Sequence, residues 1–481
     1  MSKIKNYIYH YLHLSDKIKA AIWYTICNIL QKGISFIAVP LYTRILTPAE
    51  YGRYSVFLSW IDIFDILTTF RISGGGYVAG LAKFPDDRDG YSSSMQSLEI
   101  VITTISLLLY CLFSSRINQL TGMGFYQTLL VFALMYAMPA ISLWTARQRF
   151  YYHYKNVVFV TLTSSFFIPV LGVIGAFQLK THKELGIIGA RVIVHGIMGF
   201  ILLICNCHKK FVFFHKQYWQ KTLCFNIPLL PYYFSTIILQ SSDRIIINLL
   251  VNSSAAGIYG VAYSTSMIMQ LFNSSIHASL QPWFFNQLKE KDYKNIPNMI
   301  NTLLFFVAGA NLFLIAFAPE AIRFLAPSTY YEAIWIVPPL AASVFIMFFY
   351  EHFINVEIYF ENSKMIAVAS IGAAIMNIIL NLICIPRFGY LAAGYTTLIS
   401  YFIFGITHYF FMRHICHKNN CPKNMFHLRA MLTIMALFFS FVVLLTFGYQ
   451  FIVLRVVSII ILIIFGFFYK GKIKQTLYFI K

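Results

Sequence analysis

The feature that most constrains this chain is a series of apolar stretches, each about 20 residues long, separated by short polar breaks. A helix of that length crosses the hydrocarbon core of a bilayer. Hydrophobic residues make up 59% of the 481 residues and charged residues only 11%, which excludes an ordinary soluble domain. We therefore predict an all-α integral membrane protein with about 14 transmembrane helices. The predicted spans are 20–43, 54–72, 92–114, 125–144, 157–178, 185–206, 224–250, 256–284, 297–318, 333–350, 365–385, 390–412, 428–448 and 451–469.

The distribution of the net charge of +20 predicts the orientation of these spans. Most of the 37 lysines and arginines fall in tails and loops on one side of the predicted bilayer, and they form no long block typical of nucleic-acid binding. By the positive-inside rule that side is the cytoplasm, so we expect both termini to be cytoplasmic and the N-terminus to be retained. No connection exceeds about 20 residues, which is too short for an extramembrane catalytic domain, so we expect no enzyme.

Cysteine and histidine spacing predicts neither a disulfide framework nor a metal site. His414, Cys416, His417 and Cys421 lie close in sequence, but their spacing matches no standard zinc finger. We expect no metal and no cofactor.

Several motifs recur at a nearly constant offset of about 200 residues, which indicates an internal repeat. Gly52 and Tyr54 match Gly257 and Tyr259. A repeat unit of six spans keeps its orientation, so the two units are expected to be parallel lobes that face each other across a cleft. The predicted domains are an N-terminal lobe with a cytoplasmic linker at 1–220, a C-terminal lobe at 221–412 and an extra helix pair at 413–481. The segment 207–221 mixes aromatic and basic residues and is predicted to form an interfacial amphipathic helix.

Three segments, 41–59, 226–264 and 377–401, resemble the polysaccharide-biosynthesis (O-antigen and capsule) flippases of the multidrug/oligosaccharidyl-lipid/polysaccharide exporter superfamily. The third segment is the most specific, because five of its residues fall at the family's spacing. These are Asn377, Asn381, Pro386, Gly389 and Gly394. The resemblance covers about residues 20–412.

Basic side chains inside predicted spans are costly and each requires an explanation. We predict that Lys32 and Arg244, with Arg191 third, bind a diphosphate in the cleft. Arg44 and Arg53 are predicted at the outer mouth. Snorkelling remains the alternative for Lys32, and an ion pair with Asp243 or with a carboxylate of a neighbouring helix remains the alternative for Arg244.

Polar residues at helical spacing predict the lining of the cleft. The predicted lining residues are Asn28, Gln240, Gln270, Asn273 and His277. Asp62, Asp65 and Asp243 are predicted either to couple transport to an ion or to brace the helices. For one of the first two, bracing would mean a pair with Lys32 or Arg71.

The resemblance implies a flippase that moves a polyprenyl-diphosphate-linked oligosaccharide across the bacterial plasma (inner) membrane by alternating access, for synthesis of a surface polysaccharide. The predicted partners are that glycolipid, the bilayer, a proton or sodium ion and the polysaccharide polymerase machinery, and no nucleic acid is expected. Two alternatives stay open. A multidrug or cation antiporter of the same superfamily would need an anionic cleft, and a membrane polysaccharide polymerase or ligase would carry a large outward loop.

Overall fold

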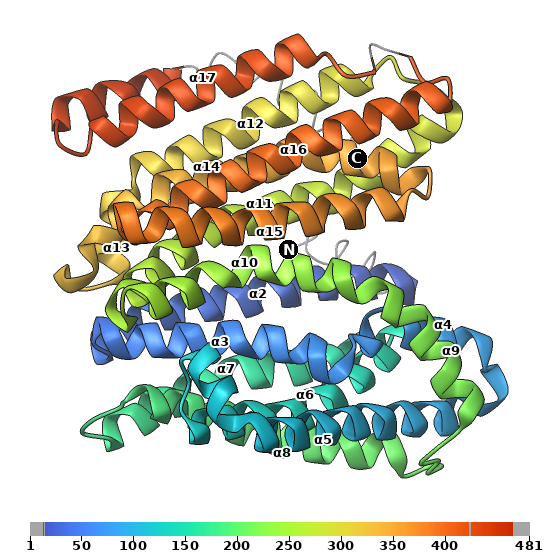
Figure 1. The fold of residues 1–481 in the computed structure, drawn as a ribbon. Coiled ribbons are helices and arrows are strands. Elements are labelled where there is room, and N and C mark those ends of the chain that lie inside the picture. Colours follow the sequence, from blue (N-terminus) through green and yellow to red (C-terminus); the bar gives the residue numbers. More distant parts are fainter. Residues whose placement is uncertain (1–12, 14, 423–424, 465–481) are drawn as a thin grey trace, which may run out of the picture. The chain divides into compact units, whose positions relative to one another are not determined.

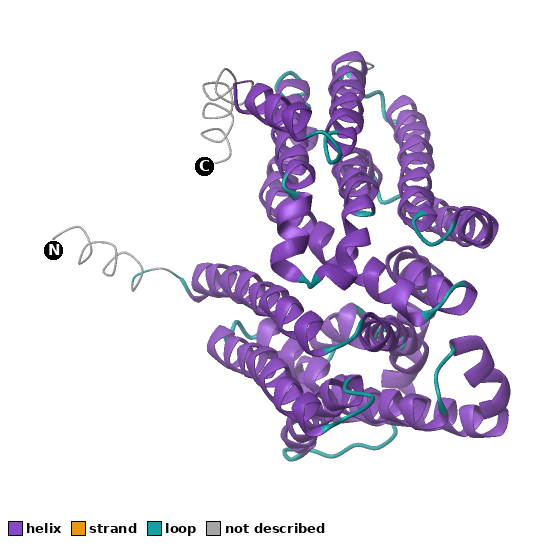
Figure 2. Ribbon diagram, turned by 90° about the vertical axis from the view of Figure 1, so that its left-hand side faces the viewer, coloured by secondary structure: helices purple, strands orange, loops and turns teal. Residues whose placement is uncertain are grey.

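The structure is a computed structural model that describes residue 13, residues 15–422 and residues 425–464 (Figure 1). Helices joined by short loops and turns build this described part, which contains no strand (Figure 2). The all-α fold class predicted from the sequence is therefore confirmed. By its internal contacts the chain divides into two compact units, Met1–Ile237 and Ile238–Lys481.

The first unit is built mainly from long helices that pack side by side. Within it, α8 packs against α6 and α7, and α7 packs against α2. Its helices are α2 (Asp16–Ile45), α3 (Pro48–Thr69), α4 (Gly76–Lys83), α5 (Arg88–Thr121), α6 (Phe125–Phe150), α7 (Tyr154–Gln178), α8 (Glu184–Cys207) and α9 (Lys216–Asn226).

Helices α7 and α8 touch through their main chains. A Cβ atom placed on Gly186 would lie 2.4 Å from the carbonyl carbon of Gly175. Small residues are what allows two membrane helices to approach this closely, since lipid gives no hydrophobic driving force between them.

The second unit surrounds one helix, α14 (Val337–Tyr359), which is buried along most of its length. Helices α11, α12, α15, α16 and α17 all pack against α14. The other helices are α10 (Leu230–Leu250), which begins in the first unit, α11 (Ser253–Glu290), α12 (Ile296–Ala316), α13 (Ala318–Leu325), α15 (Ser363–Phe388), α16 (Ala392–Lys418) and α17 (Leu428–Phe447).

Among the described residues, 10 helical segments are long and apolar enough to cross a membrane. Three more long helices, α3, α11 and α16, fall at predicted spans but carry more polar side chains. A shorter apolar helix, Ile452–Ile464, falls at the last predicted span, whose residues 465–469 lie outside the described residues. Most of the N-terminal segment predicted to be cytoplasmic also lies outside them.

The amphipathic linker differs from the prediction. Helix α9 covers only the end of the predicted segment 207–221, and residues 209–215 are not helical. The main-chain N–H of Val212 donates to Ser93 Oγ at 3.0 Å, and Lys210 Nζ donates to Asp87 Oδ1 at 2.8 Å. These contacts with α5 and the turn before it replace the helical hydrogen bonds that the sequence pattern led us to expect.

Candidate functional site

A buried polar network in the second unit centres on the carboxylate of Asp243, on α10. Asp243 is 2% exposed and accepts three hydrogen bonds. The donors are Tyr259 of α11 at 2.5 Å, Asn381 of α15 at 2.6 Å and Thr397 of α16 at 2.7 Å. Four helices are therefore tied together through one carboxylate.

The network continues along α15 through amide and hydroxyl oxygens. Asn377 Oδ1 accepts from Asn381 at 3.2 Å and from Ser242 at 3.1 Å. Asn381 Oδ1 accepts from Thr396 at 2.5 Å. Carboxylate, amide and hydroxyl oxygens are the ligand types that hard cations prefer, so the cluster has the chemistry either to hold a proton or to bind a small cation. Within the described part of the chain, no group of three or more His, Cys, Asp or Glu side chains is placed to hold a metal.

Asp243 was predicted from the sequence as a site residue, whereas its hydrogen-bond partners were not. Two signals for them were present. Tyr259 is the counterpart of Tyr54 in the repeat, and Asn377 and Asn381 are four residues apart, which places them on one face of a helix. These signals do not show which helices pack around Asp243, so the partners could not be assigned from the sequence.

Arg244, the next residue on α10, contacts different partners. Its Nη2 donates to the main-chain oxygen of Gln240 and to Ser241 Oγ, each at 3.2 Å, and its guanidinium lies 4.7 Å from the ring centroid of Tyr263. Its Nε is buried without a hydrogen-bond partner. No carboxylate is in ion-pair contact with Arg244, so the pairing left open in the sequence analysis is not formed in the described structure.

Two of the predicted lining residues, Gln240 and Gln270, meet at a small cavity in the second unit. Tyr263 and Thr397 also line it. The cavity measures about 20 Å³, which is room for one water molecule. Because Thr397 also donates to Asp243, this cavity lies directly beside the Asp243 network.

The other two predicted lining residues of α11 contact α14. Asn273 is buried and donates to the main-chain oxygen of Val344 at 2.9 Å. His277 Nε2 lies 3.2 Å from Asn355 Oδ1. Both residues thus hold α11 against α14.

A buried acid–imidazole pair nearby was not anticipated from the sequence. Glu357 Oε1 of α14 lies 2.7 Å from His408 Nδ1 of α16, and both side chains are fully buried. The pair joins the two most closely packed helices of the unit.

In the first unit, Arg191 of α8 is held by an uncharged neighbour. Its Nη2 donates to the hydroxyl of Tyr54, on α3, at 3.4 Å, and its Nε is buried without a hydrogen-bond partner. Asn28 and Lys32 lie on an exposed face of α2, together with Ser35, away from the face that packs on α7.

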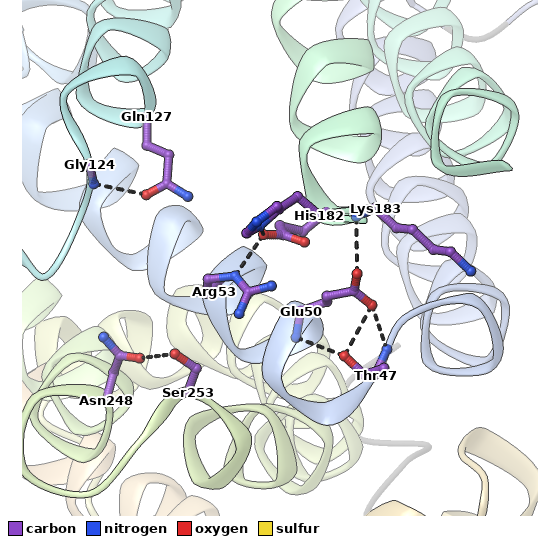
Figure 3. A network of polar contacts seen from close by, with 10 residues as sticks. Thr47, Glu50, Arg53, Gly124, Gln127, His182, Lys183, Asn248 and Ser253 are labelled. Carbon is purple, nitrogen blue, oxygen red and sulfur yellow. Dashed lines mark hydrogen bonds and ion pairs between the residues drawn. The ribbon is translucent and has the colours of Figure 1, made fainter. Parts of the chain in front are cut away.

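Arg53 and Glu50 brace the start of α3 against the α7–α8 connection (Figure 3). Arg53 Nε donates to Glu184 Oε1 at 2.6 Å. Glu50 forms a capping box with Thr47 and accepts from the main-chain N–H of Lys183 at 3.1 Å. Burial would raise the pKa of Glu50, but these main-chain hydrogen bonds outweigh it and hold the pKa below its ordinary value. Arg53, predicted at the outer mouth, is thus already paired with a carboxylate.

The remaining predicted site residues of this unit lie on α2 and α3. Asp65 Oδ2 lies 3.4 Å from Arg71 Nε, which is the bracing alternative. Asp62 is exposed on α3. Arg44 Nη1 donates to the main-chain oxygen of Pro40 at 2.9 Å at the end of α2.

The arrangement of helices is similar to that of solved membrane-protein structures. Lipid II flippase MurJ, in an inward closed conformation, matches at a TM-score of 0.67 with 15% identity, covering 94% of this chain and 99% of that protein. An inward-facing multidrug resistance MATE family transporter of the MOP superfamily matches at 0.66 with 11% identity, covering 83% and 99%. The chain is thus a multi-pass membrane protein that shares the fold of these two structures.

The family of the chain follows from its sequence. The profile of the polysaccharide biosynthesis protein family matches residues 18–288, more than half of the chain. The chain therefore belongs to the polysaccharide biosynthesis protein family, which confirms the resemblance found in its motifs.

Two named relatives are similar over much of their length. A probable low-salt glycan biosynthesis flippase, Agl15 of Haloferax volcanii, is 21% identical over 411 residues, covering 82% of this chain and 83% of its own. Lsg locus putative protein 1 of Haemophilus influenzae is 21% identical over 282 residues, covering 57% and 67%.

Proposed function

We propose that this protein is a flippase that moves a lipid-linked oligosaccharide across the plasma membrane, for synthesis of a surface polysaccharide. Membership of the polysaccharide biosynthesis protein family supports the substrate class. The names of two similar proteins, a glycan biosynthesis flippase and a lipid II flippase, agree with it.

The observation that supports the proposal most directly is the set of hydrogen-bond partners of two arginines in predicted membrane spans, Arg191 and Arg244. Arg191 and Arg244 each have a buried Nε without a hydrogen-bond partner among the described residues, and the hydrogen bonds of each guanidinium go to uncharged groups. A half-buried cation that is not hydrogen-bonded to an anion is costly in a membrane helix. A diphosphate supplies the missing negative charge, and at an effective dielectric constant near 20 one such contact at 4 Å is worth about 4 kcal/mol.

Asp243 supplies the second part of the proposal, which is coupling to an ion. Its carboxylate and the oxygens of Asn377, Asn381 and Thr397 form a network that a proton or a sodium ion could enter, and the ion would loosen or tighten the contacts among four helices. Binding and release of the ion at Asp243 would then shift the protein between its inward-facing and outward-facing states.

The experiment compares single variants in cells that lack the native gene and express each variant at an equal level in the membrane. Arg244→Ala and Arg191→Ala are expected to reduce surface polysaccharide at least tenfold and to leave lipid-linked glycan accumulating inside. Arg244→Lys is expected to retain part of the activity because it keeps the charge.

Arg116→Ala, which removes an exposed positive charge from the end of α5, is the matched control and is expected to export normally. Normal export by both Arg191→Ala and Arg244→Ala would refute the proposed diphosphate site. Lys32→Ala tests the exposed lysine of α2 in the same assay.

The second candidate is a drug or cation antiporter, favoured by the MATE transporter fold and by the exposed carboxylate of Asp62. This candidate predicts that deletion of the gene sensitises cells to cationic drugs while surface polysaccharide stays normal. A polysaccharide polymerase or ligase would instead be distinguished by a change in polymer length at unchanged export.

A further inference from the structure

Two adjoining cavities lie in the second unit where α16 ends and α17 begins. The larger, of about 1230 Å³, lies around the connection between the two helices. Four of its lining residues carry basic or titratable nitrogen, and its described lining contains no acidic residue. These four are Arg413, His417, His427 and Arg429, and all are exposed.

The smaller cavity, of about 230 Å³, is an apolar cleft between α14, α16 and α17. Phe349 and Phe353 form its floor, and Phe410 and Leu432 stand at its exposed rim. Apart from the hydroxyl of Tyr409, its lining residues carry no polar side-chain atom. For scale, an apolar protein cavity of roughly 150 Å³ accepts a benzene molecule.

The two cavities adjoin because Tyr409 and Leu428 line both of them. A chamber lined by two arginines therefore lies beside an apolar cleft formed by α14, α16 and α17. The chemistry that fits both is an anionic head joined to a hydrocarbon chain. Guanidinium groups match phosphate oxygens in geometry and charge, and basic pockets between membrane helices bind anionic lipid headgroups.

We propose that this is a binding site for an anionic phospholipid of the bilayer, with the headgroup phosphate at Arg413 and Arg429 and one acyl chain in the cleft beside Phe410 and Leu432. The charge distribution predicts that this end of α16 and α17 is cytoplasmic, where the membrane surface is negative. A bound lipid would hold α17 against α14 and α16. The site does not depend on the transported substrate, so it stands or fails independently of the proposed function.

The test uses the full-length protein, freed of lipid in detergent and titrated with phosphatidylglycerol, with binding followed by native mass spectrometry and by thermal stabilisation. The variant Arg413→Gln/Arg429→Gln is expected to bind phosphatidylglycerol roughly tenfold more weakly. The control Lys289→Gln/Lys364→Gln removes the same charge from exposed sites elsewhere in the unit and is expected to bind normally. Arg429→Gln alone, at an exposed position in the first turn of α17, provides a milder variant should the double variant not fold.

Three kinds of ligand distinguish among the possible occupants: a neutral phospholipid, a soluble phosphate and a carrier lipid. Phosphatidylcholine binding as tightly as phosphatidylglycerol would overturn the recognition of negative charge. If glycerol phosphate or inorganic phosphate binds as tightly as phosphatidylglycerol, the larger cavity is a site for a soluble anion. Polyprenyl phosphate displacing phosphatidylglycerol at equal concentration would assign the site to a carrier lipid. Equal phosphatidylglycerol binding by the wild type and the folded arginine variants would overturn the site itself.

Discussion

The hydrogen bond from Thr397 to Asp243 offers a sharp test of the buried network. Replacing Thr397 by Val keeps the size and branching of the side chain and removes one hydroxyl. The hydroxyl donates to Asp243 Oδ2 at 2.7 Å and accepts from Asn377 Nδ2 at 3.5 Å, and Thr397 is only 4% exposed. The variant therefore removes the short hydrogen bond to the carboxylate, together with the longer one from Asn377, with little change in packing.

The magnitude follows from two ranges. Hydrogen bonds to charged groups contribute about 1.5–3 kcal/mol in soluble proteins. Side-chain hydrogen bonds between membrane helices reach about 1.7 kcal/mol at most. Thr397→Val is therefore expected to lower the free energy of unfolding by about 1.5 kcal/mol, which in a unit of this size corresponds to a fall of roughly 3–6 °C in Tm.

The assay is thermal or denaturant unfolding of the purified protein in detergent, with Thr407→Val as the matched control. Thr407 lies on the same helix, is partly exposed, and donates to the main-chain oxygen of Ile403 at 2.9 Å. The control is expected to lie within about 0.5 kcal/mol of the wild type. Adding Tyr259→Phe closes a double-mutant cycle, because Tyr259 and Thr397 donate to the same oxygen. A Thr397→Val variant as stable as the Thr407→Val control would refute the reasoning.

Three further predictions concern packing, pH and a buried pair. Gly186→Ala is expected to destabilise the protein by about 1–3 kcal/mol, because the added methyl group would collide with the main chain of α7. The control is Gly189→Ala on the same helix, which has open space around it. It is expected to be neutral in the same unfolding assay. The depressed pKa of Glu50 means that its carboxylate stabilises the fold above its ordinary pKa of 4.5 and that this contribution is lost as the pH falls through the lower, folded-state value. The wild type is therefore expected to lose more stability than Glu50→Gln on acidification below about pH 4.5, and parallel pH profiles would contradict this. Glu357→Ala is expected to cost about 3 kcal/mol or more because it leaves His408 buried without its partner, and Glu357→Gln, which keeps an acceptor, is expected to recover most of that loss.

Secondary structure and membrane class were predictable because they depend on local sequence. A stretch of about 20 apolar residues has no stable option in lipid except a helix, since every main-chain N–H and C=O must be satisfied within the segment. The predicted spans accordingly correspond to helices. The linker at 207–221 was an exception, because contacts of Lys210 and Val212 with residues more than 100 positions earlier decided its conformation.

The candidate site was only partly predictable. Asp243, Arg244 and Arg191 stood out because a charged side chain within an apolar span is costly wherever it occurs. Their partners could not be found in the same way. Asn381 lies 138 residues from Asp243 along the chain, and Glu184 lies 131 residues from Arg53.

By itself, then, the amino-acid sequence determined a chain of membrane helices, the family to which it belongs and the positions of its costly charges. Only the tertiary structure decided which charges are neutralised. It paired Arg53 with Glu184, surrounded Asp243 with three uncharged donors and left the Nε atoms of Arg191 and Arg244 without hydrogen-bond partners in the part of the chain that is described. The physical reason is that helix formation is satisfied by neighbours in the chain, whereas the energy of a buried charge depends on which side chains the packing of distant helices brings within hydrogen-bond distance.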